Sequence, residues 1–201
     1  MKKYILIAGV NGAGKSTLYD QIAELHEMPR INTDEILRAN KGDWRSMRDV
    51  ILAGKQAVNL MEDYLTKGLS FNQETTLAGN KIISTVQRAK TLGYSVELHY
   101  VGVNDVSIAI ERVKQRVQNG GHGIPEEDIV RRYASSLENL QKIIPLCNEI
   151  HYYDNSDIFR KFAIYEDECL TRLSDMTPEW YEQLLPMMQR HVTRAKNQKR
   201  I

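Results

Sequence analysis

The feature that most constrains the fold is a glycine-rich turn that directly follows a short apolar run. The run is Tyr4–Ala8, and the turn is Gly9–Ser16, which reads GVNGAGKS and fits the pattern GxxxxGK[ST] at every fixed position. The segment after it, from Lys15 to about His26, has apolar residues at helical spacing. A buried strand, a glycine-rich turn and a helix in this order open an α/β fold with a phosphate-binding loop.

The residue types in this loop suit a phosphate group. Glycines allow backbone conformations that are closed to other residues, so that successive N–H groups can converge on phosphate oxygens. Lys15 can reach the β- and γ-phosphates, and the Ser16 hydroxyl can supply a ligand to Mg²⁺. We therefore expect ATP and Mg²⁺ as cofactors, with the nucleotide held by the loop residues Gly9, Asn11, Gly12, Ala13, Gly14, Lys15, Ser16 and Thr17.

Further along the chain, short β-forming runs alternate with longer stretches of helical periodicity. Strands are predicted at 30–33, 69–72, 94–103 and 149–153, and helices at about 44–68, 80–92, 106–117 and 125–144. Strands that alternate with helices imply a parallel sheet with right-handed crossovers. The predicted fold class is α/β, a P-loop NTPase-type parallel β-sheet flanked by helices.

The pattern changes after Asp157. The runs 159–165 and 168–173 predict a hairpin, and a helix is predicted from Pro178 to about His191. With 201 residues the chain has room for one ordinary α/β domain. We expect a single domain over 1–201, with a C-terminal extension at about 157–201.

Composition argues against two classes of partner. The 27 basic and 26 acidic residues leave a net charge of +1, which gives no long-range attraction for nucleic acid or an anionic membrane. No apolar run approaches the roughly 20 residues needed to span a bilayer. Cys147 and Cys169 lack the spacing of a metal or redox motif, so a reducing, cytoplasmic setting is the expectation.

One segment resembles a guanine-binding element. Asn40–Asp43 reads NKGD and matches the NKxD pattern of GTPases. In GTPases that pattern follows a late strand, whereas here it follows the second predicted strand and precedes a long helix. A polar loop is the better interpretation, and guanine specificity is disfavoured.

Carboxylates follow two predicted strands on the side where the phosphate loop lies. Asp34 comes just beyond the second strand, and Glu74 closes the third together with Thr75 and Thr76. In an open parallel sheet the carboxyl ends of the strands form the ligand site. Asp34 can accept the proton of an attacking hydroxyl, or it can act as the N-cap of the turn Glu35–Arg38. Glu74 can equally be a solvated strand end.

Arginines lie on two predicted helices that a glycine-rich turn joins. Arg112 and Arg116 are one helical turn apart, Gly120–Gly123 breaks the helix, and Arg131 and Arg132 follow. Such arginines can close over phosphates, stabilise charge on the transferring group and exclude water. The segment at about 112–136 is therefore a candidate lid, and ordinary solvated helix faces are the alternative.

These segments together resemble the zeta toxin family of P-loop kinases, particularly its small stand-alone members. The resemblance rests on the phosphate loop, on Ile31–Ile36, on Phe71–Leu77 with its Glu-Thr-Thr, and on Arg112–Leu140. In the last segment RVQNGGHGIP leads to RRY and then to SLENL. The matching stretches run from about residue 4 to 156.

The resemblance implies transfer of a phosphoryl group from ATP to the hydroxyl of a small molecule. The best-known substrates of the family are UDP-N-acetyl sugars. Asp34 matches the catalytic base, Lys15 the phosphate-binding lysine and Glu74 the acidic residue near the acceptor. An antitoxin partner is compatible with this resemblance, but the active-site residues do not imply one.

The resemblance also assigns roles further along the chain. Arg116 and one of Arg131 or Arg132 match the lid arginines, and the loop with Asn155 matches the place where such kinases hold adenine. A tight turn at a strand end is the alternative for that loop. Two other functions stay open: a nucleoside or nucleotide kinase, and a non-catalytic nucleotide-binding switch. The Glu-Thr-Thr and Gly-Gly-His segments disfavour the first, and an acceptor base disfavours the second.

Overall fold

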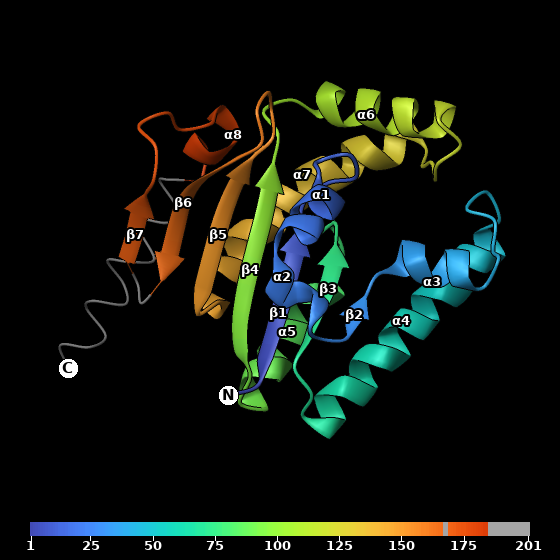
Figure 1. Cartoon of the computed structure of the whole chain (residues 1–201), viewed down its shortest axis with the longest axis horizontal. Coiled ribbons are helices and arrows are strands. Elements are labelled where there is room, and N and C mark those ends of the chain that lie inside the picture. Colours follow the sequence, from blue (N-terminus) through green and yellow to red (C-terminus); the bar gives the residue numbers. More distant parts are fainter. Residues whose placement is uncertain (167–168, 185–201) are drawn as a thin grey trace.

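A seven-stranded sheet forms the centre of the molecule (Figure 1). The structure, a computed structural model, describes residues 1–166 and 169–184. The strand order is β2-β3-β1-β4-β5-β6-β7. The strands are β1 Lys3–Ala8, β2 Arg30–Ile31, β3 Phe71–Thr75, β4 Ser95–Gly102, β5 Glu149–Asp154, β6 Arg160–Glu166 and β7 Cys169–Arg172.

The sheet is mixed rather than wholly parallel. Strands β1 to β5 run parallel, whereas β6 pairs antiparallel with β5, and β7 antiparallel with β6. The predicted C-terminal hairpin is thus confirmed, but it extends the main sheet instead of standing apart. The short loop 155–159 between β5 and β6 explains the direction, because a parallel pair needs a crossover of a dozen or more residues.

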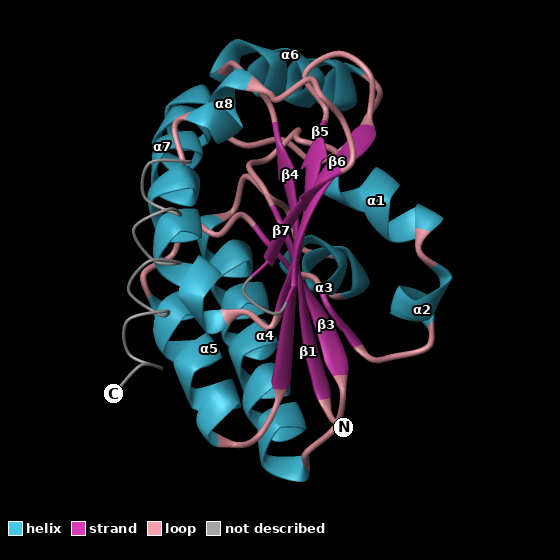
Figure 2. Ribbon diagram, turned by 90° about the vertical axis from the view of Figure 1, so that its left-hand side faces the viewer, coloured by secondary structure: helices cyan, strands magenta, loops and turns pink. Residues whose placement is uncertain are grey.

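Helices cover the two faces of the sheet unequally (Figure 2). The long helices α4, α5 and α7 lie against one face, and the short helices α1 and α2 lie against the other. The helices are α1 Lys15–Gln21, α2 Ala23–His26, α3 Thr33–Ala39, α4 Met47–Lys67, α5 Lys81–Thr91, α6 Val106–Gln118, α7 Glu126–Ile143 and α8 Glu179–Glu182, with a 3-10 turn at Ile144–Leu146.

Strand β1 lies in the middle and is buried on both faces. Tyr4 and Leu6 belong to the apolar cluster under the long helices, and Ile5 and Ile7 belong to the cluster under α1 and α2. Continuous apolar character is what a strand covered on both faces requires. The phosphate loop therefore starts from a strand that is paired on both sides and buried on both faces.

Three predicted boundaries are wrong. The single helix predicted at 15–26 breaks at Ile22, which adopts an extended backbone and packs with Leu25 against the cluster under α1 and α2. The second strand ends at Ile31, and α3 begins at Thr33. The third strand is Phe71–Thr75 rather than 69–72, because its polar end pairs with β1.

The long helix predicted at 44–68 is confirmed as α4, within three residues at its start. The Ser46 hydroxyl caps it by accepting from the N–H of Asp49, and Gly68 ends it in the left-handed conformation. The predicted C-terminal helix begins as expected after Pro178. It ends at Glu182 rather than near His191, and residues 185–201 lie outside the described residues. Among the described helices, none has the length and apolar character needed to cross a membrane.

Helix α8 packs on the carboxyl end of β4 through one large side chain. The fully buried Trp180 lies so close to Gly102 that a Cβ there would stand 2.2 Å from Cε2 of the indole. The indole Nε1 donates to Oδ1 of Asp154 at the end of β5 (3.2 Å). This contact joins the C-terminal segment to the strand ends.

We expect Gly102→Ala to lower the free energy of unfolding by about 1–3 kcal/mol, because the methyl group overpacks the indole site. Gly54→Ala is the control. Gly54 lies in α4 with no atom within 4 Å of an added Cβ, so alanine should stabilise by about 0.5–1 kcal/mol. Urea denaturation measures both, and equal effects at the two positions would contradict the packing assigned to α8.

Candidate active site

The phosphate loop lies between the end of β1 and the start of α1. Gly9 and Gly12 have φ values of 143° and 82°, in the left-handed region that side chains disfavour. A Cβ on Gly9 would meet the Val101 carbonyl oxygen at 2.3 Å, and one on Gly12 the Ala109 carbonyl oxygen at 2.5 Å. Both glycines are therefore required for the loop to pack against β4 and α6.

Lys15 is buried at the foot of this loop. Its Nζ donates to the Val10 carbonyl oxygen (3.1 Å) and lies 3.9 Å from Oε1 of Glu74. Burial lowers the pKa of the Lys15 ammonium, while the carboxylates of Glu74 and Asp34 oppose that shift. Ser16 and Thr17 are exposed next to it, at the start of α1.

The Glu74 carboxylate connects three elements of the site. Its Oε2 accepts from Nη2 of Arg30 (2.6 Å) and from Nδ2 of Asn32 (2.9 Å), while Oε1 faces Lys15. The Arg30 guanidinium stacks 3.4 Å above the ring centre of Tyr19. Glu74 is thus an ordered, largely buried carboxylate, and the interpretation as a solvated strand end is wrong.

The two threonines beside Glu74 are half-buried. The Thr75 hydroxyl accepts from the N–H of Leu77, which has a positive φ of 58°. Asn139 on α7 donates to the Leu77 carbonyl oxygen (2.8 Å). Thr75 therefore holds the turn after β3 in place, and any contact of Thr75 or Thr76 with an acceptor stays a prediction.

Asp34 lies in the first turn of α3, with its side chain 44% exposed. The residue that caps this helix is Asn32, whose Oδ1 accepts from the N–H groups of Asp34 and Glu35. The interpretation of Asp34 as the N-cap is therefore wrong. Strand β2 ends earlier than expected, so α3 also begins earlier and its N-cap is Asn32. The Asp34 carboxylate is left available for other contacts.

His122, from the glycine-rich turn between α6 and α7, is a site residue that the sequence did not single out. Its Nε2 lies 3.5 Å from Oδ1 of Asp34, and its ring meets Trp44 edge-on at 5.7 Å. Burial lowers the pKa of His122, and the positive charges of Arg116 and Arg132 act in the same direction. The Gly-Gly-His sequence is the signal that could have found it, because it forms part of the family resemblance, which assigns no role to the histidine.

The lid arginines occupy different environments. Arg132 on α7 is mostly buried, and its Nη1 donates to Oδ1 of Asn11 in the phosphate loop (3.2 Å). The adjacent Arg131 is 63% exposed and pairs with Asp128 at 2.5 Å. The structure therefore brings Arg132 to the loop and leaves Arg131 in solvent.

Arg116 on α6 has two buried nitrogens, Nε and Nη2, with no hydrogen-bond partner among the described residues. Its side chain packs against Gly121 in the turn that carries His122, and its charge acts on both Lys15 and His122. Buried N–H groups are rarely left unpaired. Unpaired guanidinium donors near a phosphate loop fit an anionic ligand such as a nucleotide phosphate.

Asn155 supports the loop from the end of β5. Its Nδ2 donates to the Ala13 carbonyl oxygen (2.8 Å), and its own carbonyl oxygen accepts from Nη1 of Arg112 (2.8 Å). The residue thereby joins β5, α6 and the phosphate loop. A contact between Asn155 and adenine stays a prediction.

The site thus combines a glycine-rich loop with a buried lysine, two carboxylates at adjacent strand ends, and two arginines from the lid. On a mostly parallel sheet flanked by helices, these features define a nucleotide-binding P-loop protein of the kinase type, a phosphotransferase. The family described as zeta toxin matches residues 1–167. The chain belongs to the zeta toxin family.

Relatives of known sequence and structure agree with this assignment. An uncharacterised protein of Haemophilus influenzae is 36% identical over 131 residues, which cover 65% of this chain and 92% of that protein. The structure of the PezAT toxin–antitoxin system of Streptococcus pneumoniae aligns with a TM-score of 0.58 at 17% identity, over 94% of this chain and 85% of the other.

A second group of similar structures is the AvrRxo1-ORF1:AvrRxo1-ORF2 complex. The form with sulphate ions aligns with a TM-score of 0.68 at 16% identity, and covers 92% of this chain. The form with ATP aligns with a TM-score of 0.69 at 15% identity. This chain spans 63% of the length of those chains. At these identities the likeness is one of fold.

We expect Glu74→Gln to lower the free energy of unfolding by about 2 kcal/mol, because neutral glutamine removes the carboxylate that faces the buried Lys15 and leaves Arg30 with only its longer contact to Glu35. Glu62→Gln is the control, since Glu62 pairs with Arg88 on the exposed surface, where ion pairs contribute little. Urea denaturation at neutral pH measures both variants. An unchanged Glu74→Gln variant would show that this carboxylate is not needed to hold the buried cations.

Proposed function

We propose that this protein is an ATP- and Mg²⁺-dependent kinase that transfers the γ-phosphoryl group to a hydroxyl of a small molecule. The observation that carries the proposal is the half-exposed carboxylate of Asp34, which lies 3.5 Å from Nε2 of His122 on the turn that joins the helices of Arg116 and Arg132, and whose charge acts on the buried Lys15. A nucleotide switch needs the lysine and the loop, but it has no need of a carboxylate on the acceptor side.

Residues of the phosphate loop and the lid would bind ATP, the phosphate donor. Lys15 would exchange its contacts with the Val10 carbonyl and Glu74 for phosphate oxygens, which relieves the cost of a buried ammonium. The unpaired nitrogens of Arg116 and the guanidinium of Arg132 would stabilise charge that spreads onto the transferring group. Ser16 would hold Mg²⁺, which neutralises charge on the phosphates when bound.

Asp34 and the residues around Glu74 would bind and activate the acceptor hydroxyl. The Asp34 carboxylate would accept the proton of the attacking hydroxyl as the new oxygen–phosphorus bond forms and the bond to ADP breaks. Glu74, held by Arg30 and Asn32, is rigid enough to orient a second hydroxyl of the acceptor. Thr75 and Thr76 border the same position.

A UDP-N-acetyl sugar is our candidate acceptor, because such sugars are the known substrates of zeta toxins. We propose an antitoxin as a partner, because the PezAT structure is that of a toxin–antitoxin system. We further propose that the whole chain is one domain, with a lid at about 112–136 and an extension at about 157–201. A nucleoside kinase shares this sheet, loop and lid, and the acceptor separates the two.

We expect Asp34→Asn to bind ATP with a dissociation constant within about twofold of wild type, and to transfer phosphate at least roughly a hundredfold more slowly. Asp20→Asn, which changes an exposed carboxylate on α1, should transfer normally. Calorimetry measures ATP binding, and mass spectrometry measures phosphate gained by a mixture of UDP-sugars, nucleosides and other alcohols. If wild-type protein phosphorylates nothing in the mixture, the kinase assignment fails, and a product among the nucleosides would identify a nucleoside kinase.

The two neighbouring arginines should differ. Arg132→Ala should lower kcat by roughly a hundredfold to a thousandfold, because it removes a cation that faces the loop. Arg131→Ala should stay within about twofold, because Arg131 pairs with Asp128 in solvent. Initial rates with the acceptor found above measure the effect, and thermal unfolding checks both folds. A larger loss of kcat for Arg131→Ala than for Arg132→Ala would contradict the orientation of α7 in which Arg132 faces the phosphate loop.

A further inference from the structure

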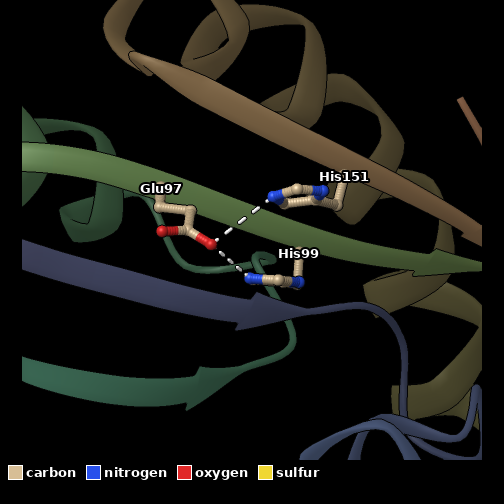
Figure 3. A group of neighbouring side chains, drawn as sticks. All are labelled: Glu97, His99 and His151. Atoms are coloured by element: carbon tan, nitrogen blue, oxygen red, sulfur yellow. Dashed lines mark hydrogen bonds and ion pairs between the residues drawn. The ribbon is translucent and has the colours of Figure 1, made fainter. Parts of the chain in front are cut away.

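A second group of chemically active side chains lies within β4 and β5, before the carboxyl ends of these strands, where the phosphate loop packs. Glu97 and His99 project from β4, and His151 projects from the neighbouring strand β5 (Figure 3). His99 and His151 are paired across the two strands, and Glu97 is two residues before His99, so all three share one face. Among the described residues, helices α1 and α2 lie over β1 on this face and leave β5 and β6 uncovered (Figures 1 and 2).

The ligand atoms of this cluster are already close together. Oε1 of Glu97 lies 2.7 Å from Nε2 of His99 and 3.5 Å from Nε2 of His151, and the three atoms lie within 4.8 Å of one another. Ligand atoms on a tetrahedral zinc ion, with bonds of about 2.0–2.1 Å, stand roughly 3.4 Å apart. Small rotations of these side chains would therefore create the required separation.

We propose that Glu97, His99 and His151 bind one divalent transition-metal ion, with Zn²⁺ as the best match. Two imidazoles and one carboxylate form a common ligand set for zinc, with a fourth position available. Glu149 is in reach of that position, because its Oε1 lies 2.7 Å from Nε2 of His151. Mg²⁺ and Ca²⁺ are disfavoured, because both prefer oxygen ligands.

The surroundings of His99 support this assignment. Its Nδ1 lies 3.2 Å from the Tyr153 hydroxyl, which can accept an N–H when Nε2 is occupied by a metal. Partners of this kind orient metal-binding histidines and set their tautomer. The ring also stacks on His151 at 4.5 Å with an angle of 18°, so both rings are held in place.

Charge and burial favour a cation at the same point. His99 and His151 are buried, and carboxylates approach them from both strands. Lys3 lies 3.8 Å from Oε2 of Glu97, but its closer partner is Glu24 at 2.7 Å. The positive charge of Lys161 also acts on His99 and is shared with Glu97 and Glu149. A divalent ion would replace the proton between His99 and Glu97 and neutralise the two carboxylates, Glu97 and Glu149.

The environment of His151 limits the expected affinity for zinc. Nδ1 of His151 is buried without a hydrogen-bond partner among the described residues, so the N–H that metal binding requires there has no acceptor. A missing partner of this kind typically costs about 10–100-fold in metal affinity. We therefore expect micromolar rather than nanomolar binding, which would tie β4 to β5 without touching the phosphate loop.

The test is a titration of the full chain, stripped with EDTA and dialysed, with ZnCl2 in a calorimeter. We expect one ion per chain with a dissociation constant of about 1–10 µM, and no saturable heat with MgCl2. His99→Gln and His151→Gln should each weaken binding at least about tenfold. His26→Gln, which removes an exposed imidazole on α2, should bind within about twofold of wild type.

Co²⁺ provides a second readout, because its visible absorption reports tetrahedral ligation, and that absorption should disappear in His151→Gln. Thermal unfolding and circular dichroism without metal establish whether each variant folds. If one of the histidine variants does not fold, Glu97→Gln is titrated in its place. Absence of saturable zinc binding would overturn the proposal, as would binding that the histidine variants retain. The cluster would then be a hydrogen-bonded network only. Phosphoryl transfer does not enter this test, so its outcome is independent of the proposed function.

Discussion

A buried lysine ammonium at the carboxyl edge of the sheet is the constraint on which the rest of the site depends. Burial disfavours the charge of Lys15 and lowers its pKa. The Glu74 carboxylate offsets this cost, and Arg30 and Asn32 hold that carboxylate in place. Because Glu74 comes from β3 and Arg30 from β2, the phosphate loop depends on β3, which pairs with β1, and on the edge strand β2, which pairs with β3. The strand order is therefore what supplies the residues that stabilise the charge of Lys15 in the loop.

On the side of α6 and α7, the loop is held by hydrogen bonds to neutral oxygen acceptors rather than by ion pairs. Asn155 joins the loop to α6 through Arg112, and Asn11 accepts from Arg132 on α7. These contacts place the arginines near the loop while leaving their charge uncompensated, as anion binding requires. His122, on the glycine-rich turn between α6 and α7, lies 3.5 Å from Asp34, so this turn connects both helices with the start of α3.

Much of the fold was predictable, because apolar periodicity reports burial directly. Strand β1, helix α4 and the alternation of strands and helices follow from it. Two differences from the expected fold lie where pairing overrides local preference. The polar end of β3 is a strand because Glu74 and Thr75 pair with β1, and the C-terminal hairpin joins the main sheet because β6 pairs with β5. Register of this kind is set between distant segments, and a single sequence does not specify it.

By itself, the sequence determined the phosphate loop and the residue types of the site, because the loop is a local motif whose backbone conformation depends on its own glycines. Tertiary structure decided which residues face the ligand. Successive residues on a helix point about 100° apart, so only the packing of α7 brings Arg132 to Asn11 and turns Arg131 to solvent. The same holds for His99 and His151, which are remote along the chain and meet only because β4 and β5 pair in register.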